Sequence, residues 1–287
     1  MPEVKTRVGT VRIAESGEGP PIVLLHATLH DQHDYDEVRD ALARRHQVLA
    51  VDWPGHGESD PLPHKTRAGG PLFADVLEDI VRELELPPAA FIGNSVGGYA
   101  AARLALRQPD RVTGIVLANS GGFGTPTGFN KLVCRLLGSP AVSRRVFQAF
   151  VPRYMKAASE SDRAIESRAI AQSQTREGAA VAAGIWRSFL DPDYDLSAEA
   201  QHITAPTLLV WGANDPVLPL REGERIQSLI PGSTLTALPT GHVTFSSDPA
   251  AFLNVVEPFL ESLAANRPDP SDESHRSHQS GPSIVGG

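Results

Sequence analysis

A serine flanked by glycines stands in the segment FIGNSVGGYAAA, where Ser95 lies between Gly93 and Gly97. An apolar run precedes Ser95 and a run of small residues follows it, a pattern typical of a sharp turn from a strand into a helix. Glycines suit the flanking positions because side chains there would collide with the neighbouring chain. Ser95 is therefore a candidate nucleophile, although a generic glycine-rich turn has the same pattern.

A serine hydroxyl is a weak nucleophile unless a base takes its proton, and the base needs a carboxylate to orient it. Asp215 follows the apolar run in LLVWGANDPVLP, and His242 lies in LPTGHVTF after the last run with strand character. Taken alone, Asp215 could simply cap the turn before Pro216, and His242 could be a solvated loop residue. Their order along the chain, serine then aspartate then histidine, favours a catalytic set.

Other polar residues are weaker candidates. The segment HATLHDQHDYD contains metal-ligand types at His30, Asp31, His33 and Asp34, but it lacks the H-E-x-x-H spacing that places two imidazoles on one helical face. We therefore expect no metal site. Cys134 lies in NKLVCRLLG, an apolar helical pattern in which a packed thiol is the common outcome.

Strand and helix patterns alternate along the first part of the chain, which predicts an α/β fold with a mostly parallel central sheet flanked by helices. The strand rhythm stops at about residue 122 and resumes after about residue 201. We expect a first core segment at 1–121, a helical cap insertion at 122–201 with breaks at 138–140 and at Pro152, and a second core segment at 202–265. Residues 266–287 are rich in Ser, Pro and His and predict a disordered tail.

The composition of the 287 residues narrows the class of protein. A hydrophobic content of 41% supplies a core, and a net charge of -8 without a basic stripe argues against a nucleic-acid partner. No apolar run approaches the ~18 residues of a membrane span, and the first residues lack the pattern of a secretion signal. We expect a cytoplasmic protein with a small-molecule substrate and no membrane partner.

The chain resembles the α/β-hydrolase superfamily from about Arg12 to Leu263. The segments that carry the resemblance are GNSVGG, DWPGHGESD, GANDPVLP and the Gly-His pair at 241–242. Within the superfamily it looks like the capped, single-domain serine hydrolases, which include small esterases, carbon-carbon bond hydrolases and haloperoxidase-like enzymes. Related enzymes that use an aspartate at the elbow do not match Ser95.

The resemblance implies further site residues. The amides of Thr28 and Val96 would form the oxyanion hole, which meets negative charge as it develops on the substrate oxygen. Ala27 stands where the family usually has glycine, and the methyl group there could tilt this loop. His30 and Asp31 would border the substrate pocket, whereas His26, Asp52 and His56 are expected to be structural.

Two features of the segment expected to form the cap bear on the substrate. Lys131 to Lys156 contains six cationic and no acidic residues, which indicates either a solvated helical face or attraction of an anionic substrate. Aromatic residues, Trp186 among them, either pack in the core or line an apolar pocket.

The sequence thus predicts a serine hydrolase that cleaves a small carboxylic ester or related acyl compound with Ser95, His242 and Asp215, and without a cofactor. Alternatives that remain open are carbon-carbon hydrolysis of a vinylogous diketone acid, a non-hydrolytic lyase, and a ligand-binding protein on the same fold. The natural substrate and the oligomeric state do not follow from these residues.

Overall fold

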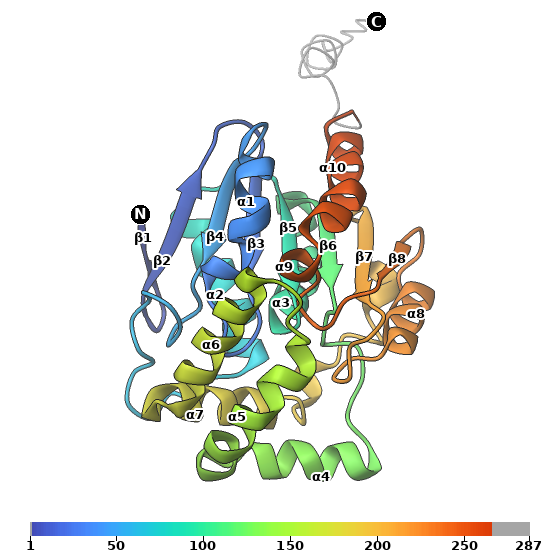
Figure 1. Ribbon diagram of the computed structural model, residues 1–287. Helices are drawn as coiled ribbons and strands as arrows, with labels where there is room; N and C mark the ends of the chain where they lie inside the picture. The colour runs from blue at the N-terminus through green and yellow to red at the C-terminus, as the bar shows by residue number, and fades with distance from the viewer. Residues whose placement is uncertain (1, 266–287) are drawn as a thin grey trace, which may run out of the picture.

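Apolar runs form the strands of one eight-stranded sheet in the computed structural model, which describes residues 2–265 (Figure 1). The central strands β3, β5 and β7 are buried at every residue, as expected of parallel strands covered on both faces. The strands are β1 (Glu3–Thr6), β2 (Gly9–Ser16), β3 (Pro21–Leu25), β4 (Gln47–Val51), β5 (Ala89–Asn94), β6 (Val112–Ala118), β7 (Thr207–Gly212) and β8 (Thr234–Leu238).

The strand order is β1-β2-β4-β3-β5-β6-β7-β8. All neighbours from β4 to β8 pair in parallel, and the hairpin of β1 and β2 adds an antiparallel edge. The carboxyl ends of parallel strands meet at one edge of a sheet, where such folds bind their ligands. The loops that carry Thr28, Ser95, Asp215 and His242 all begin at that edge.

Helices cover both faces of the sheet. Side chains alternate across each strand, so Val23 and Leu25 of β3 join the core on one side while Ile22 and Leu24 join the core on the other. The first core is completed by α2, α3 and α8, and the second by α1, α9 and α10. The helices are α1 (Asp36–Ala43), α2 (Gly70–Glu83), α3 (Val96–Arg107), α4 (Gly128–Leu137), α5 (Pro140–Met155), α6 (Glu160–Gln174), α7 (Arg176–Ser188), α8 (Leu220–Leu229), α9 (Thr244–Ser247) and α10 (Pro249–Ala265), with short 3-10 turns at Gln32–Tyr35, Pro109–Arg111, Pro192–Tyr194 and Ala200–His202.

The chain between β6 and β7 carries α4 to α7, which we call the insert, residues 122–201. These helices lie beyond the carboxyl edge of the sheet, at the lower end of the view in Figure 1. The expected break at 138–140 is present, because α4 ends before Gly138 and α5 begins at Pro140. The expected break at Pro152 is wrong: α5 continues through it to Met155, and the Pro152 carbonyl still accepts a hydrogen bond from Lys156 at 3.2 Å.

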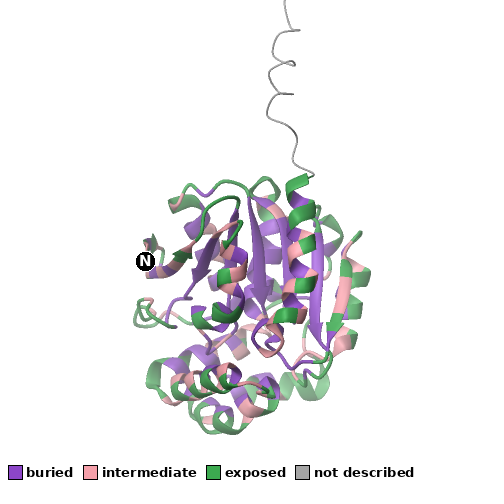
Figure 2. Cartoon of the chain, turned by 45° about the horizontal axis from the view of Figure 1, so that its top comes forward, coloured by how far each residue is buried: buried purple, intermediate pink, exposed green. Residues whose placement is uncertain are grey.

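Burial follows this arrangement. Figure 2 shows the central strands buried, whereas the helices of the insert present exposed outer surfaces. Within residues 2–265 no helix is long and apolar enough to cross a membrane. The predicted disordered tail lies outside the described residues.

Candidate active site

Ser95 occupies a strained turn between β5 and α3. Its backbone has φ 54° and ψ -113°, a conformation that non-glycine residues rarely adopt. A Cβ atom on Gly93 would lie 2.4 Å from the Gly97 carbonyl oxygen, and one on Gly97 would lie 2.3 Å from the Leu25 carbonyl oxygen. Both glycines are therefore required for close backbone approach. The turn leaves Ser95 partly exposed at the N-terminus of α3.

Asp215 and His242 are in direct contact, as their order along the chain led us to expect. The His242 Nδ1 atom lies 2.6 Å from Asp215 Oδ2, and both side chains are buried. The other carboxylate oxygen, Oδ1, accepts a hydrogen bond of 2.7 Å from the Val217 amide. These contacts hold the carboxylate in place so that it can orient the imidazole.

His242 is held from two sides. Its amide donates to the Tyr154 carbonyl at 3.0 Å, and its carbonyl accepts from the Asn94 side chain at 3.0 Å. A Cβ atom on Gly241 would lie 2.5 Å from the carbonyl oxygens of Tyr154 and Met155. The end of α5 in the insert thus fixes the loop that carries His242.

Asn119 is a site residue that the sequence analysis missed. It follows β6 with φ 42°, and its side chain donates to Asp215 Oδ2 at 2.6 Å while accepting from the Gly212 amide at 2.9 Å. Asparagine tolerates the left-handed region better than most residues. The signal available in the sequence was a polar residue directly after a buried strand, at the same edge as Ser95.

The loop after β3 contains the predicted oxyanion donor Thr28, which is partly exposed. The neighbouring Leu29 has φ 70°, and its amide donates to His56 Nε2 at 3.1 Å. Ala27 is not among the residues with positive φ, so the backbone does not demand glycine there. Val96, the other predicted donor, is the first residue of α3, where amides lack partners within the helix.

Two neutral histidines lie beneath this loop. His26 Nδ1 donates to the Ala27 carbonyl at 2.7 Å, and Nε2 accepts from the Trp53 amide at 3.1 Å. Burial lowers the pKa of His26 well below its ordinary value and lowers the pKa of His56 to about 4. These contacts favour the structural interpretation of both residues, since each imidazole serves as a fixed hydrogen-bonding group.

Asp52 is buried under the same loop. Its oxygens accept from the amides of Gln32 at 2.8 Å and Glu58 at 3.0 Å, and burial raises its pKa to about 6. Asp52 therefore fixes two turns of backbone, in line with the structural role expected of it.

The remaining predicted site residues lie in different settings. His30 has a fully buried side chain that lies between Asp34, 2.6 Å from Nδ1, and the Tyr154 hydroxyl, 2.8 Å from Nε2. Asp31 accepts from the His33 amide and pairs with Arg168 of α6 at 3.2 Å. Asp31 and the Nε2 atom of His30 are thus engaged with protein groups, and His30 Nδ1 is buried against the Asp34 carboxylate.

Trp186 belongs to an aromatic row in the insert. Its ring lies 6.1 Å from Phe150 and 5.3 Å from Phe189, measured between ring centroids. Phe150 contacts Tyr154 at 5.5 Å, and Tyr154 meets the His242 ring edge-on at 5.6 Å. The row joins Trp186 to the imidazole of the site through aromatic surface.

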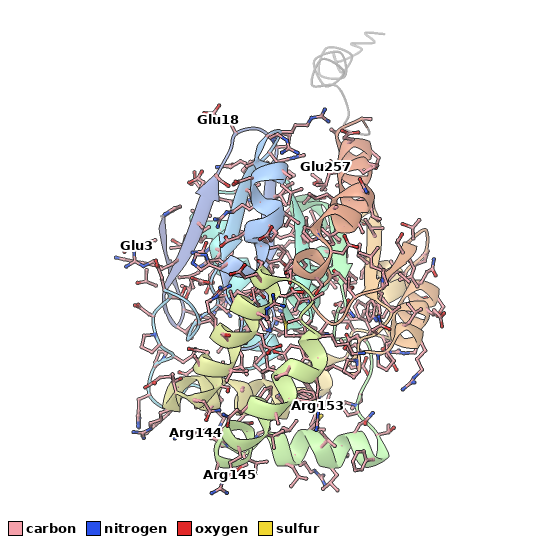
Figure 3. All side chains as sticks on the ribbon, viewed as in Figure 1. Glu3, Glu18, Arg144, Arg145, Arg153 and Glu257 are labelled. Atoms are coloured by element: carbon pink, nitrogen blue, oxygen red, sulfur yellow. The ribbon has the colours of Figure 1, made fainter. Side chains whose placement is uncertain are left out.

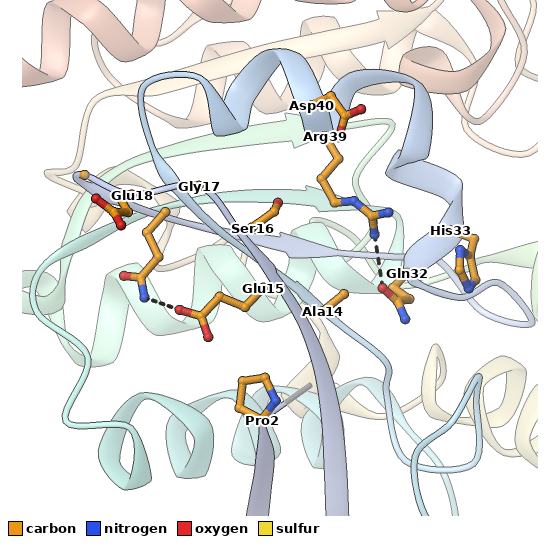
Figure 4. Close-up of a pocket in the computed structure, with 12 residues that line it drawn as sticks. Pro2, Ala14, Glu15, Ser16, Gly17, Glu18, Gln32, His33, Arg39 and Asp40 are labelled. Carbon is orange, nitrogen blue, oxygen red and sulfur yellow. Dashed lines mark hydrogen bonds between the residues drawn. The ribbon is translucent and has the colours of Figure 1, made fainter.

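No group of three or more metal-ligating side chains is gathered in residues 2–265. The groove in Figure 4 lies elsewhere, between the end of β2 and the start of α1, and polar residues such as Glu15, Arg39 and Asp40 line it. Ser95, Asp215 and His242 do not line it.

Comparisons with known proteins agree with the fold. A family model described as alpha/beta hydrolase fold matches residues 20–249. A pimeloyl-[acyl-carrier protein] methyl ester esterase from Nitrosospira multiformis is 29% identical, over 84% of this chain and 94% of the relative. A 2-hydroxy-6-oxononadienedioate/2-hydroxy-6-oxononatrienedioate hydrolase from Cupriavidus pinatubonensis is 29% identical, over 78% of this chain and 79% of the relative.

Among solved structures, a hydrolase from Pseudomonas aeruginosa superposes with a TM-score of 0.78 at 25% identity, over 90% of this chain and 97% of its own. The family model covers most of the chain, and the mostly parallel eight-stranded sheet flanked by helices agrees with that fold. The chain belongs to the α/β hydrolase family.

Proposed function

We propose that the protein is a serine hydrolase that cleaves a small carboxylic ester through an acyl-enzyme. The Ser95 hydroxyl attacks the ester carbonyl while His242 accepts its proton. His242 then returns the proton to the leaving alcohol, and water releases the acyl group by the reverse sequence. Asp215 stays ionised and holds the imidazole.

The observation that carries this proposal is the contact of 2.6 Å between His242 Nδ1 and Asp215, at the edge of the sheet where Ser95 occupies its strained turn. Nδ1 donates to the carboxylate, so Nε2 is left as the basic nitrogen. Among the described residues the Ser95 hydroxyl has no hydrogen-bond partner. In serine hydrolases, the hydrogen bond between the serine hydroxyl and its histidine base often forms only when substrate is bound.

The amides of Thr28 and Val96 are proposed to bind the oxyanion. Val96 is at the start of α3, where the helix dipole adds positive potential. Thr28 lies on the loop that His26 and His56 support from below. Loss of a single such donor costs about 10²- to 10³-fold in rate in other enzymes.

The substrate is proposed to be apolar near its acyl group. The aromatic row from Tyr154 to Trp186 borders His242, whereas Asp31 and the Nε2 atom of His30 are engaged with protein groups. The insert would then act as a cap that closes an apolar pocket over the sheet. A relative that acts on a methyl ester supports this choice of chemistry.

Ester turnover tests the proposal. Wild type should release nitrophenol from short-chain nitrophenyl esters, and Ser95→Ala should lower kcat by at least about 10³-fold. Ser120→Ala is the matched control, because the Ser120 hydroxyl donates only to the neighbouring Gly121 carbonyl at 2.9 Å. Undiminished ester turnover by Ser95→Ala would overturn the mechanism.

Carbon-carbon hydrolysis of a vinylogous diketone acid is the second candidate, because one relative carries out a reaction named for such a substrate. It predicts weak activity on simple esters and strong activity on a ring-cleavage product, so both substrates should be assayed side by side. A lyase would form product without solvent oxygen. A binding protein would retain its ligand in Ser95→Ala without turnover by the wild type.

A further inference from the structure

The outer face of the insert exposes apolar side chains that a soluble protein normally buries. Phe129 is 76% exposed and Leu132 and Leu136 are each 51% exposed, all on α4, while Val146 on α5 is 37% exposed. Phe129, Leu132 and Leu136 are three and four residues apart, so they share one face of the helix. The opposite side of α4 is anchored by buried Cys134 and Leu137.

The same region carries several cations with no acidic residue among them. No Asp or Glu occurs between Gly121 and Ser159, whereas the whole chain has a net charge of -8. Figure 3 shows Arg144, Arg145 and Arg153 at the end of the molecule formed by the insert, away from Glu18 and Glu257. The exposed cations are Lys131, Arg135, Arg144, Arg145, Arg153 and Lys156.

These cations lack ion-pair partners among the residues that the structure describes. Within residues 2–265 the side chains of all six are outside every ion pair, although other exposed arginines, such as Arg45 and Arg225, do form ion pairs. A solvated helix would normally place acidic residues among its basic ones. The insert therefore carries on α4 and α5, with Lys156 directly after α5, both an exposed apolar strip and exposed cations that form no ion pair within residues 2–265.

We propose that this face, defined by Phe129, Leu132, Leu136 and the six cations, docks on an anionic lipid surface. A helix with Phe and Leu on one side and Lys or Arg beside them is suited to lie in the headgroup region. Each cation near an anionic membrane adds electrostatic attraction, which supplements the apolar anchor. The proposal concerns binding at the surface of a membrane and departs from the sequence-based expectation of no membrane partner.

The positive charge of this face favours an anionic lipid surface over a second copy of the chain as its partner. A symmetric dimer brings the same surface of both subunits together, so it would set two groups of six cations against each other. An anionic bilayer instead offers both negative charge and an apolar interior. The inference does not depend on the chemistry proposed for Ser95, since none of these residues belongs to that site.

Vesicle sedimentation tests the proposal. The full chain should bind vesicles that contain phosphatidylglycerol, and should bind pure phosphatidylcholine vesicles at least about 10-fold more weakly. High salt should weaken the binding, because it screens exposed charges. Arg144→Glu with Arg145→Glu should lower affinity for the anionic vesicles by at least about 10-fold, and Phe129→Ser should lower it further.

The matched control is Arg44→Glu with Arg45→Glu, which reverses two adjacent arginines near α10 and should leave vesicle binding unchanged. Thermal unfolding of each variant checks that the fold is retained. Equal binding to both vesicle types, no binding by the wild type, or equal loss in the two double variants would overturn the proposal. Concentration-dependent dimer formation that Phe129→Ser abolishes, without vesicle binding, would assign the face to self-association instead.

Discussion

At the scale of single residues, Asp215 accepts hydrogen bonds from His242, Val217 and Asn119. Removal of the Asn119 side chain eliminates its hydrogen bond to Asp215 together with the one it accepts from the Gly212 amide. Asn119→Gly keeps the left-handed backbone that φ 42° requires. Loss of a hydrogen bond to a charged group costs about 1.5–3 kcal/mol, so kcat/KM for ester hydrolysis should fall about 10- to 100-fold.

Glu85→Gly controls for the backbone change, because Glu85 is exposed and has φ 47°. Steady-state kinetics of both variants, with thermal unfolding measured alongside, separates a loss at the site from a loss of folding. Equal activity in Asn119→Gly and Glu85→Gly would mean that the hydrogen bond from Asn119 to Asp215 does not contribute to catalysis.

The sequence analysis named Ser95, Asp215 and His242 as candidates because each stands in a short motif just past a predicted strand. Asn119 also follows a strand, but an asparagine at a strand end is so common that its type carries little information. Tyr154 could not be found from sequence, because its contacts with His30 and His242 depend on how the insert folds. Local spacing does not reveal such contacts.

At the scale of elements, the turn between β5 and α3 depends on close approach of backbone. Gly97→Ala would place a Cβ atom 2.3 Å from the Leu25 carbonyl, so the free energy of unfolding should fall by about 3 kcal/mol. Gly232→Ala is the comparison, since Gly232 has φ 74° and no atom near its Cβ position. It should cost about 1 kcal/mol from backbone strain alone.

Urea unfolding of both glycine variants at one pH gives this comparison. If Gly97→Ala proved no more costly than Gly232→Ala, the turn would not be as tightly packed as the distances indicate.

The element boundaries show where pattern reasoning succeeds. The apolar runs of β3, β5 and β7 and the alternation with helices predicted the parallel sheet. Pro152 was expected to end a helix because proline lacks an amide hydrogen, yet α5 continues for three more residues. Buried contacts of Val151, Tyr154 and Met155 hold that last turn in place, and sequence pattern does not record them.

At the scale of the whole molecule, two buried groups should give opposing pH dependences of stability. The pKa of His56 is lowered to about 4, so its contribution to stability is complete above its unfolded value and is lost as pH falls toward 4. The pKa of Asp52 is raised to about 6, so its ionised form destabilises the fold at neutral pH, and this penalty is relieved as pH falls below 6.

Each shift corresponds to about 3 kcal/mol between pH 7 and pH 4. The stability of His56→Gln relative to wild type should therefore rise on acidification, and that of Asp52→Asn should fall. Chemical unfolding at several pH values measures both differences. Two difference curves with the same sign of slope would contradict the assigned shifts.

Net charge is a property of the whole chain, and in the sequence analysis it argued against a nucleic-acid partner, whereas the expectation of no membrane partner rested on the lack of a long apolar run. The structure leaves six cations of α4, α5 and the residue after α5 exposed, so the local charge is opposite to the average. The division of exposed from buried apolar residues on α4 follows from its packing against α5 and α7, which composition does not reveal.

The most direct test of the proposed chemistry is intact mass after exposure to a small fluorophosphonate. Wild type and Ser120→Ala should each gain one adduct, Ser95→Ala should gain none, and His242→Ala should react slowly because Ser95 lacks its base. An adduct that persists in Ser95→Ala, or no adduct in a wild type that hydrolyses esters, would contradict the assignment of Ser95 as the nucleophile.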